Sequence, residues 1–186
     1  MLHEVMNLSV TTGALRRGSV LRLTLTALLM GMTIVLSMSV FSIPVPGSHL
    51  YFNDTVINIA AILLDPVAAF VVGGVGAFLG DFFFYPAPMF VSLVTHGLQA
   101  VIVSVLSRRL FPRQQALASS VAVAVGAVVM VVGYTLGRAY VYSTPEYAML
   151  KLPFQILQAG FGAVMSIILL YPLRLRAALQ HILQRH

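Results

Sequence analysis

The stretch VAAFVVGGVGAFLGDFFF, residues 67–84, decides the fold because it is apolar along its whole length apart from Asp81. A helix that crosses a bilayer needs about 20 predominantly apolar residues, and a stretch of this length is typical of such a helix. Small residues recur within it at positions that let neighbouring helices approach closely. They are Ala69, Gly73, Gly76, Ala77 and Gly80. This stretch therefore predicts a membrane-spanning helix packed inside a bundle.

The whole chain has the composition of a membrane protein. Of its 186 residues, 59% are hydrophobic and 9% are charged, and the mean hydropathy is +0.95. A soluble domain carries about 25% charged residues, so this chain could not cover a globule with polar surface. The composition excludes an ordinary soluble enzyme, a nucleic-acid-binding protein and a disordered protein. The sequence contains no cysteine, which excludes disulfides, thiolate metal sites and cysteine nucleophiles.

Apolar segments separated by proline, glycine and charged residues predict an all-α bundle of six membrane-spanning helices. The predicted spans cover residues 21–43, 51–64, 67–84, 89–107, 116–140 and 152–173. Together they make residues 1–186 a single membrane domain. A tight turn is expected at Asp65-Pro66, because proline biases the residue before it away from helix. Residues 142–151 predict a polar connection before the last span.

Basic residues indicate how the six spans are oriented. If both termini are cytoplasmic, nine arginines lie on the cytoplasmic side, and only Arg138 and Lys151 lie towards the outside. The nine are Arg16, Arg17, Arg22, Arg108, Arg109, Arg113, Arg174, Arg176 and Arg185. Basic loops of membrane proteins are found mainly on the cytoplasmic side, so we predict cytoplasmic N- and C-termini. The net charge of +6 then reflects orientation in the bilayer and not a nucleic-acid partner.

Polar residues inside the predicted spans gather in their outer halves. Ionisable groups within a membrane are costly and are usually functional. Nine residues are predicted to bind a small molecule: Asn53, Asp54, Asn58, Asp81, Tyr85, His96, Gln99, Gln155 and Gln158. The cytoplasmic halves carry few comparable groups, so we expect a pocket that opens to the outside and not a continuous pore. Of the nearby aromatic residues, Tyr51, Phe52 and Tyr85 are expected to lie closest to this pocket.

Three of these residues also have purely structural interpretations. Asp54 could be a helix N-cap, a position that aspartate favours. Asp81 could form a salt bridge with Arg138, and His96 could be a neutral core histidine bonded to a backbone carbonyl. The common depth of the nine residues is the observation that favours a ligand site.

Two further patterns each allow two interpretations. Gln155 and Gln158 could bind ligand, or they could join helices by hydrogen bonds, a common role of glutamine in membranes. Ala27 and Gly31 repeat the small-residue spacing on the first span. They predict either internal packing or a docking surface for another membrane protein. For residues 67–84 the same spacing is interpreted as internal packing.

Several catalytic and cofactor motifs are missing from the sequence. There is no phosphate-binding loop for a nucleotide, no pair of histidines at metal-ligand spacing and no serine in a nucleophile elbow. We therefore expect no bound cofactor, no metal and no catalytic residues. If the protein moves its ligand uphill, a partner must supply the energy.

The chain resembles the substrate-binding S components of energy-coupling factor (ECF) transporters, which import vitamins into bacteria. The resemblance is clearest in YFNDTVINIAAILLDPVAAFVVGGVGAFLGDFF, residues 51–83, where an aromatic residue, asparagine and aspartate open an apolar helix. A glycine-rich helix ending in aspartate follows it. IPVPG, residues 43–47, is similar to the family's loop after the first helix. The nearest branch is the one associated with substrates of the hydroxymethylpyrimidine or pyridoxine type.

The resemblance implies a function and partners. An S component captures its vitamin from outside at high affinity and topples in the membrane to release it inwards. It works with an integral membrane T component and two cytoplasmic ATPase subunits in the bacterial cell membrane. Ala27 and Gly31 stand where the family's first helix carries two alanines that contact the T component, with glycine replacing the second alanine.

Two other classes of function are compatible with the residues alone. The chain could be a small membrane enzyme acting on a lipid, with Asp81 and His96 as acid and base, or a stand-alone facilitator or channel. An enzyme would turn over substrate without partners, and a facilitator would pass ligand into liposomes. A binding subunit would do neither.

Overall fold

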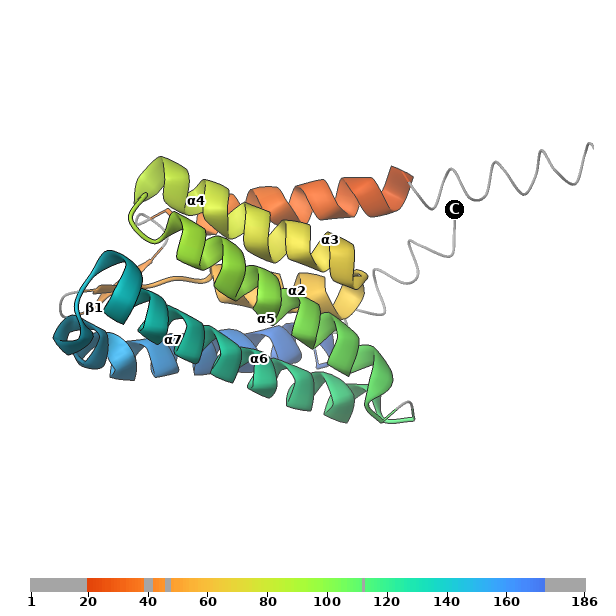
Figure 1. The fold of residues 1–186 in the computed structure, drawn as a ribbon. Helices are drawn as coiled ribbons and strands as arrows, with labels where there is room; N and C mark the ends of the chain where they lie inside the picture. The colour runs from red at the N-terminus through yellow and green to blue at the C-terminus, as the bar shows by residue number, and fades with distance from the viewer. Residues whose placement is uncertain (1–19, 39–41, 46–47, 112, 173–186) are drawn as a thin grey trace, which may run out of the picture.

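In the computed structural model, residues 20–38, 42–45, 48–111 and 113–172 are described (Figure 1). The first described helix covers Val20–Leu36. The other elements, in chain order, are β1 (Ile43–Val45), β2 (Ser48–Leu50), α2 (Asn53–Leu63), α3 (Pro66–Phe70), η2 (Val71–Val75), α4 (Gly76–Phe84), α5 (Met89–Arg109), α6 (Gln115–Gly137), η3 (Arg138–Tyr142) and α7 (Pro145–Leu170). The segments η2 and η3 are π-helical and continue their neighbouring α-helices. The described chain is thus a helical bundle with one short β-hairpin.

Four helices are long and apolar enough to cross a membrane. They are Pro66–Phe84, Met89–Arg109, Gln115–Tyr142 and Pro145–Leu170. They match the predicted spans 67–84, 89–107, 116–140 and 152–173 in position. The described helix of the first predicted span, Val20–Leu36, and α2 are shorter.

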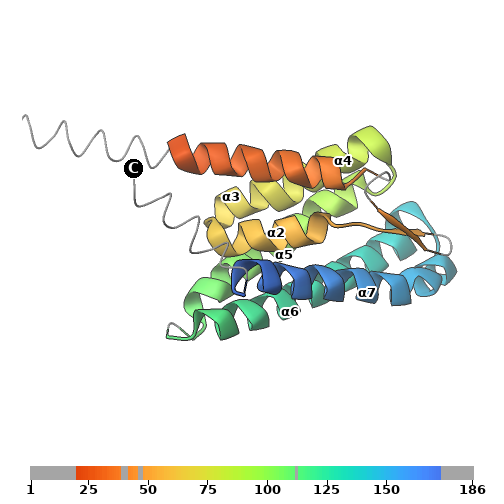
Figure 2. The same cartoon turned by 180° about the vertical axis from the view of Figure 1, so that it is seen from behind.

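The second predicted span, residues 51–64, contains a helix too short to cross the bilayer. α2 has 11 residues, which at 1.5 Å per residue give about 16 Å, roughly half of the hydrocarbon thickness. Ten of these residues are buried. α2 lies between the first helix and α7 (Figure 2), so it fills the interior of the bundle and does not cross it.

The first predicted span, residues 21–43, ends earlier than expected. The helix stops at Leu36, and Ile43 belongs to β1, which pairs with β2 in antiparallel register Ile43↔Leu50. The expectation of an all-α fold therefore needs one correction, because the loop after the first helix forms a hairpin. Pro44 is exposed in β1, and proline is tolerated in such a short strand at the edge of a sheet.

The last predicted span, residues 152–173, begins seven residues too late. α7 starts at Pro145, where the side chain of Thr144 accepts a hydrogen bond from the Tyr147 amide at 3.3 Å. Proline at the first helical position and a threonine N-cap are both favourable at a helix start. Most of the predicted polar connection at residues 142–151 is therefore helical, and Lys151 lies inside α7.

Small residues on the Pro66–Phe84 helix allow it to pack tightly between the first helix and α5 (Figure 1). A Cβ atom at Gly73 would lie 2.8 Å from the backbone oxygen of His96 on α5. A Cβ atom at Gly80 would lie 2.7 Å from the Ser37 side chain, which follows the first helix. These contacts confirm that the small residues of this helix serve internal packing.

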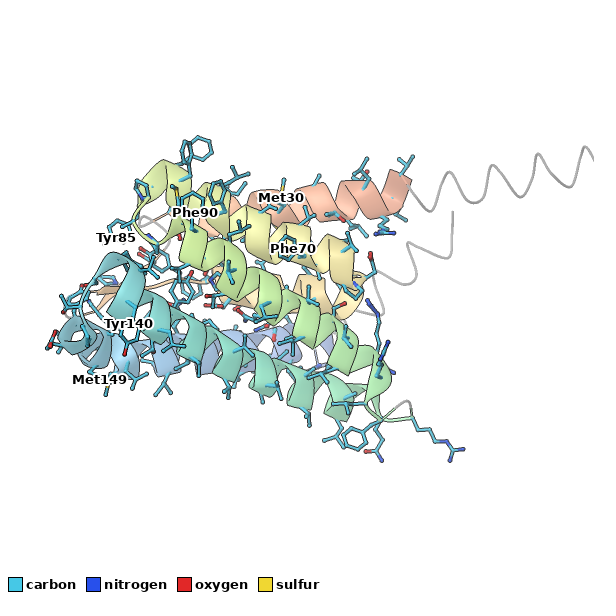
Figure 3. All side chains as sticks on the ribbon, in the orientation of Figure 1. Met30, Phe70, Tyr85, Phe90, Tyr140 and Met149 are labelled. Carbon is cyan, nitrogen blue, oxygen red and sulfur yellow. The ribbon has the colours of Figure 1, made fainter. Side chains whose placement is uncertain are left out.

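Large apolar side chains cover the outside of the bundle. Phe90, Tyr140 and Met149 point away from it (Figure 3) and are 62%, 78% and 62% exposed. Apolar residues on the outside and polar residues inside are what a bilayer favours, since hydrocarbon replaces water around the protein. The outer surface of the described helices therefore fits a lipid environment.

Two arginines lie at one end of the bundle. At this end Arg22 forms an ion pair with Asp65 at 2.7 Å, and Arg108 donates hydrogen bonds to the Leu64 carbonyl and to Ser104. We call the opposite end, which carries β1 and β2, the hairpin end. The positions of Arg22 and Arg108 at one end agree with the predicted orientation, which remains a prediction.

The close contact between α7 and α2 gives a test of the packing. A Cβ atom at Gly162 would lie 2.6 Å from the Cβ atom of Asp54, whereas one at Gly160 would meet nothing within 4 Å. Gly162→Ala should therefore lower stability by about 1–3 kcal/mol through overpacking. Gly160→Ala, on the same helix, should leave stability unchanged or raise it, because alanine favours helix more than glycine does. Thermal unfolding of the purified protein in detergent compares the two; equal shifts would contradict the packing of α7 on α2.

Candidate functional site

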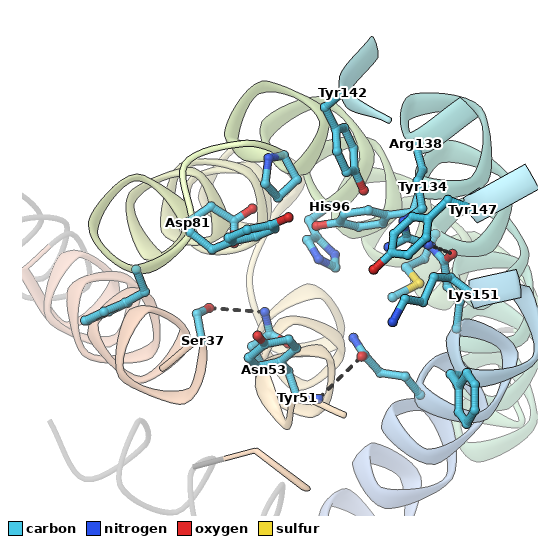
Figure 4. Close-up of a pocket in the computed structure, with 17 residues that line it drawn as sticks. Ser37, Tyr51, Asn53, Asp81, His96, Tyr134, Arg138, Tyr142, Tyr147 and Lys151 are labelled. Atoms are coloured by element: carbon cyan, nitrogen blue, oxygen red, sulfur yellow. Dashed lines mark hydrogen bonds between the residues drawn. The ribbon is translucent and has the colours of Figure 1, made fainter. Parts of the chain in front are cut away.

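A cavity of about 400 Å³ lies at the hairpin end of the bundle (Figure 4). Residues of α2, α4, α5, α6, η3 and α7, together with residues that connect helices, form its wall. The lining residues are Ser37, Tyr51, Asn53, Asp81, Phe84, Tyr85, Pro88, His96, Met130, Tyr134, Arg138, Tyr142, Tyr147, Lys151, Phe154, Gln155 and Gln158. Charged, amide and phenol groups thus converge from segments far apart in the sequence, which is the arrangement of a ligand pocket.

The structure places six of the nine predicted ligand-binding residues on the wall of this cavity: Asn53, Asp81, Tyr85, His96, Gln155 and Gln158. The other three, Asp54, Asn58 and Gln99, are buried and do not line it. The predicted residues therefore form two layers, a wall around the cavity and a floor beneath it.

Hydrogen bonds join the floor residues to the wall. His96 Nδ1 lies 2.8 Å from Gln99 Oε1, and Gln99 Nε2 donates to Asn58 Oδ1 at 3.3 Å. Gln158 Nε2 donates to Asp54 Oδ2 at 2.7 Å, while the other oxygen of Asp54 lies 3.6 Å from His96 Nδ1. Hydrogen bonds of this kind stabilise buried polar groups, although Asp54 Oδ1 has no hydrogen-bond partner among the described residues. The network closes the cavity towards the interior of the bundle.

This network decides between the alternative roles of two residues. Asp54 is not an N-cap: Phe52 holds that position of α2, and the Asp54 carboxylate accepts its bond from α7. His96 is bonded to the Gln99 side chain and not to a backbone carbonyl. Its ring also packs edge-on against the Tyr134 ring, with centroids 5.2 Å apart.

Asp81 and Arg138 do not pair with each other. Asp81 accepts a hydrogen bond from Ser92 Oγ, which also contacts the Tyr134 hydroxyl, so three helices meet at this serine. Arg138 Nη1 donates to Gln155 Oε1 at 3.0 Å. The alternative interpretation of Asp81 as a salt-bridge partner of Arg138 is therefore wrong.

The two glutamines of α7 combine both predicted roles. Gln155 bonds Arg138 on η3, and Gln158 bonds Asp54 on α2, so each joins two helices. Both also line the cavity. Hydrogen bonding between helices and exposure to the cavity are compatible here.

Comparison with known proteins agrees with this architecture. The family described as "ECF-type riboflavin transporter, S component" matches residues 17–175. This chain belongs to that family. The S component is also 34% identical over 126 residues to a protein of Pyrococcus woesei described as "Uncharacterized protein in gap 3'region", covering 67% of this chain and 82% of that protein. Membership makes the chain a membrane transport protein of the vitamin-binding type, in a family of transporter subunits and not of enzymes.

Several wall residues of the S component were absent from the predicted set. The most informative is Lys151, which was expected in an outer loop and is buried in α7. A sequence signal for it existed, because Thr144-Pro145 is a strong helix start. From that start, Tyr147, Lys151, Gln155 and Gln158 follow at intervals of four, four and three residues and share one helical face.

The three aromatic residues expected near the pocket divide into two groups. Tyr51 and Tyr85 line the cavity, but Phe52 does not. Phe52 packs edge-on against Phe161 at 5.5 Å and faces a second, apolar cavity of about 460 Å³ between the first helix, α2 and α7. Tyr51 and Phe52 are adjacent in the sequence just before α2, but their side chains therefore face different cavities.

The predicted docking residues of the S component lie on its first helix. Ala27 is exposed, and a Cβ atom at Gly31 would meet no atom of the described residues within 4 Å. Neither residue packs against another described helix closely enough to require its small size. Internal packing thus does not account for these two positions, and docking remains the prediction.

No metal site is evident in the parts of the chain that the structure describes, since no three His, Asp or Glu side chains there converge as ligands. The polar groups of the wall are suited to an organic molecule, to which amides, phenols and charged side chains can donate and accept hydrogen bonds.

The floor network predicts different effects for the same change at two positions. Gln158→Leu removes the donor to Asp54, which is 1% exposed, and should destabilise the S component by about 1–3 kcal/mol. Gln155→Leu, one turn earlier, removes a bond to Arg138, which is only partly buried and keeps access to water, so its effect should be smaller. Unfolding midpoints in detergent measure both. A larger loss for Gln155→Leu would contradict the role of Asp54 in the floor.

Proposed function

We propose that this S component captures a vitamin or vitamin precursor from outside the cell and delivers it inwards. It does so with an integral membrane T component and two cytoplasmic ATPase subunits, in the cell membrane. One observation carries the proposal: the cavity has polar walls built from most of the bundle and a floor closed by bonded side chains. Such a site suits capture of a ligand from one side and offers no open path through the protein.

The ligand we propose is a small planar heterocycle of the hydroxymethylpyrimidine or pyridoxine type. Five tyrosine rings and two phenylalanine rings line the cavity beside the polar groups and could stack on such a ring: Tyr51, Tyr85, Tyr134, Tyr142, Tyr147, Phe84 and Phe154. Asp81, His96 and Asn53 supply acceptors and donors for ring nitrogens and hydroxyl groups. A volume of about 400 Å³ lies within the range of small-molecule sites, about 300–1,000 Å³.

Riboflavin is the second candidate. It is favoured by the description of the matching family, which names riboflavin as the transported vitamin. It offers a larger planar ring and several hydroxyl groups to the same wall. Both candidate ligands would stack on the tyrosine rings, and riboflavin has the larger ring system.

The decisive experiment identifies the ligand directly. The full chain is purified in detergent, and small molecules released by denaturation are identified by mass spectrometry. We expect a vitamin-type heterocycle that rebinds tightly without being altered, and uptake by cells only when the ATPase subunits are co-expressed. Turnover by the isolated protein would instead favour a lipid-modifying enzyme, and flux into liposomes would favour a facilitator.

Substitutions in the wall test the site itself. Removing one buried hydrogen-bond partner costs about 1–3 kcal/mol, so His96→Ala or Asp81→Ala should weaken binding of the identified ligand by one to two decades. Ser120→Ala, on the exposed face of α6 and bonded only to its own helix, should leave binding unchanged. Titration calorimetry measures all three. Unchanged affinity in both wall variants would remove them from the site.

Docking to the T component is proposed at Ala27 and Gly31. Gly31→Leu should prevent assembly with the T component, because a bulky side chain keeps the helices apart, and it should spare ligand binding. Gly160→Leu is a matched control, since Gly160 also has open space around it and lies on α7. Co-purification of the complex measures assembly. Normal assembly of Gly31→Leu would exclude this face of the first helix.

A further inference from the structure

A buried cation in the cavity wall has no partner of opposite charge among the described residues. Lys151 is 4% exposed, and its Nζ has no hydrogen-bond partner in that part of the chain. Its side chain extends from α7 into the cavity (Figure 4). Burying a charged amine is costly unless it is paired and hydrogen-bonded. The position of Lys151 therefore demands a partner that the described residues do not supply.

The carboxylates of the chain are placed elsewhere. In the described part of the chain, none lies within 4.0 Å of the Lys151 amine. Their positions are Asp54 bonded to Gln158, Asp65 paired with Arg22, Asp81 bonded to Ser92, and Glu146 in the exposed first turn of α7. The fifth acid of the sequence, Glu4, lies outside the described residues.

An aromatic ring holds the amine in place. Lys151 Nζ lies 5.1 Å from the centroid of the Tyr147 ring, one helical turn earlier on α7. Such a contact attracts the amine to the face of the ring and leaves its hydrogens free to donate in other directions. The amine is thus oriented without being neutralised.

A second cation lies on the same wall. Arg138 is joined to α7 through Gln155, which is one turn after Lys151. A guanidinium has five N–H groups, and the Gln155 bond uses only one of them. Figure 4 shows Arg138 and Lys151 on one side of the cavity and Asp81 on the opposite side. The cavity therefore has a cationic wall facing a carboxylate.

We propose that the ligand carries an anionic group, a carboxylate or a phosphate, which binds between Lys151 and Arg138 while its ring end faces Asp81. This inference rests on the proposed function and narrows it to acidic vitamin derivatives. A neutral acceptor would satisfy one N–H of the amine but would leave the buried charge in place. An anion satisfies several N–H groups and cancels the charge, and charge-assisted bonds are about twice as strong as neutral ones.

The test compares ligands that differ only in the acidic group. Titrations in a neutral detergent use pyridoxine against 4-pyridoxate and pyridoxine 5′-phosphate, and riboflavin against riboflavin 5′-phosphate. The wild-type protein should bind an acidic member at least ten times more tightly than its neutral parent. The carboxylate and phosphate arms show which anion is preferred. Equal or tighter binding of both neutral parents would overturn the inference while leaving the proposed function intact.

Variants assign this preference to Lys151. Lys151→Gln should remove most of the preference for the acidic ligand, and Lys151→Arg should keep it. Retention of the full preference in Lys151→Gln would overturn the assignment. Short-chain phosphatidylglycerol, added as a competitor, should not displace the acidic ligand. Displacement would mean that the anion is a lipid headgroup and would also overturn the inference of a soluble ligand.

A measurement without ligand tests the inference about Lys151 separately from the proposed function. In the ligand-free chain the Lys151 amine gains only the contact with the Tyr147 ring and bears the cost of burial, so Lys151→Met should leave the thermal unfolding midpoint unchanged or raise it. A clear fall in the midpoint would mean that the amine has a structural partner besides this ring, and the inference would fail. If none of the pyridoxine or riboflavin compounds binds, the proposed heterocycle is wrong. The stability measurement still tests whether the Lys151 amine lacks a structural partner.

Discussion

The structure depends on the burial of one short helix that carries polar side chains. α2 is too short to cross a bilayer, and its polar residues Asp54 and Asn58 lie inside the bundle. Buried polar groups need bonded partners, and α5 and α7 supply them: Gln99 donates to Asn58, and Gln158 donates to one oxygen of Asp54. That requirement fixes where these two helices stand relative to α2, and it sets the depth at which the cavity ends.

Above this floor, the cavity combines three kinds of chemistry in a small volume. Tyrosine rings provide flat apolar surface, amides and hydroxyls provide neutral hydrogen bonds, and charged groups stand on opposite walls. In a site surrounded by low-dielectric material, charges act more strongly than they would in water. Selectivity for a ligand can therefore rest on a few residues, above all on Lys151 and Asp81, which have opposite charges and lie on opposite sides of the cavity.

Much of the fold follows from the sequence because the bilayer imposes simple constraints on length and polarity. The length of the apolar stretches predicted the four long helices. The spacing of small residues such as Gly73 and Gly80 predicted the tightly packed helix, and the common depth of the polar residues predicted the end of the bundle at which the pocket lies. Element ends were harder to predict. Hydropathy does not register the difference between an amphipathic helical turn and a polar loop, which is why Lys151 was misplaced although Thr144-Pro145 signals a helix start.

The division of the predicted site into wall and floor could not be read from the sequence. Spacing shows which residues share a helical face, as with Asp54 and Asn58, but not which neighbouring helix that face meets. The partner of Asp54 is Gln158, more than a hundred residues later, and only the packing of α7 on α2 brings the two together. The same limit applies to Phe52, which faces away from the pocket that its neighbour Tyr51 lines.

The π-helical turn η2 has a consequence for where Asp81 points. Each residue of an α-helix advances by about 100° around the axis, while a π-turn, with bonds between residues five apart, takes up an additional residue without adding a turn. The helix after η2 is therefore rotated relative to the helix before it. A chain one residue shorter within Val71–Val75 would keep its apolar pattern in α3 but would direct Asp81 to a different neighbour. Deletion of one residue in this turn would therefore change the side chains that line the cavity, although the helix would remain apolar.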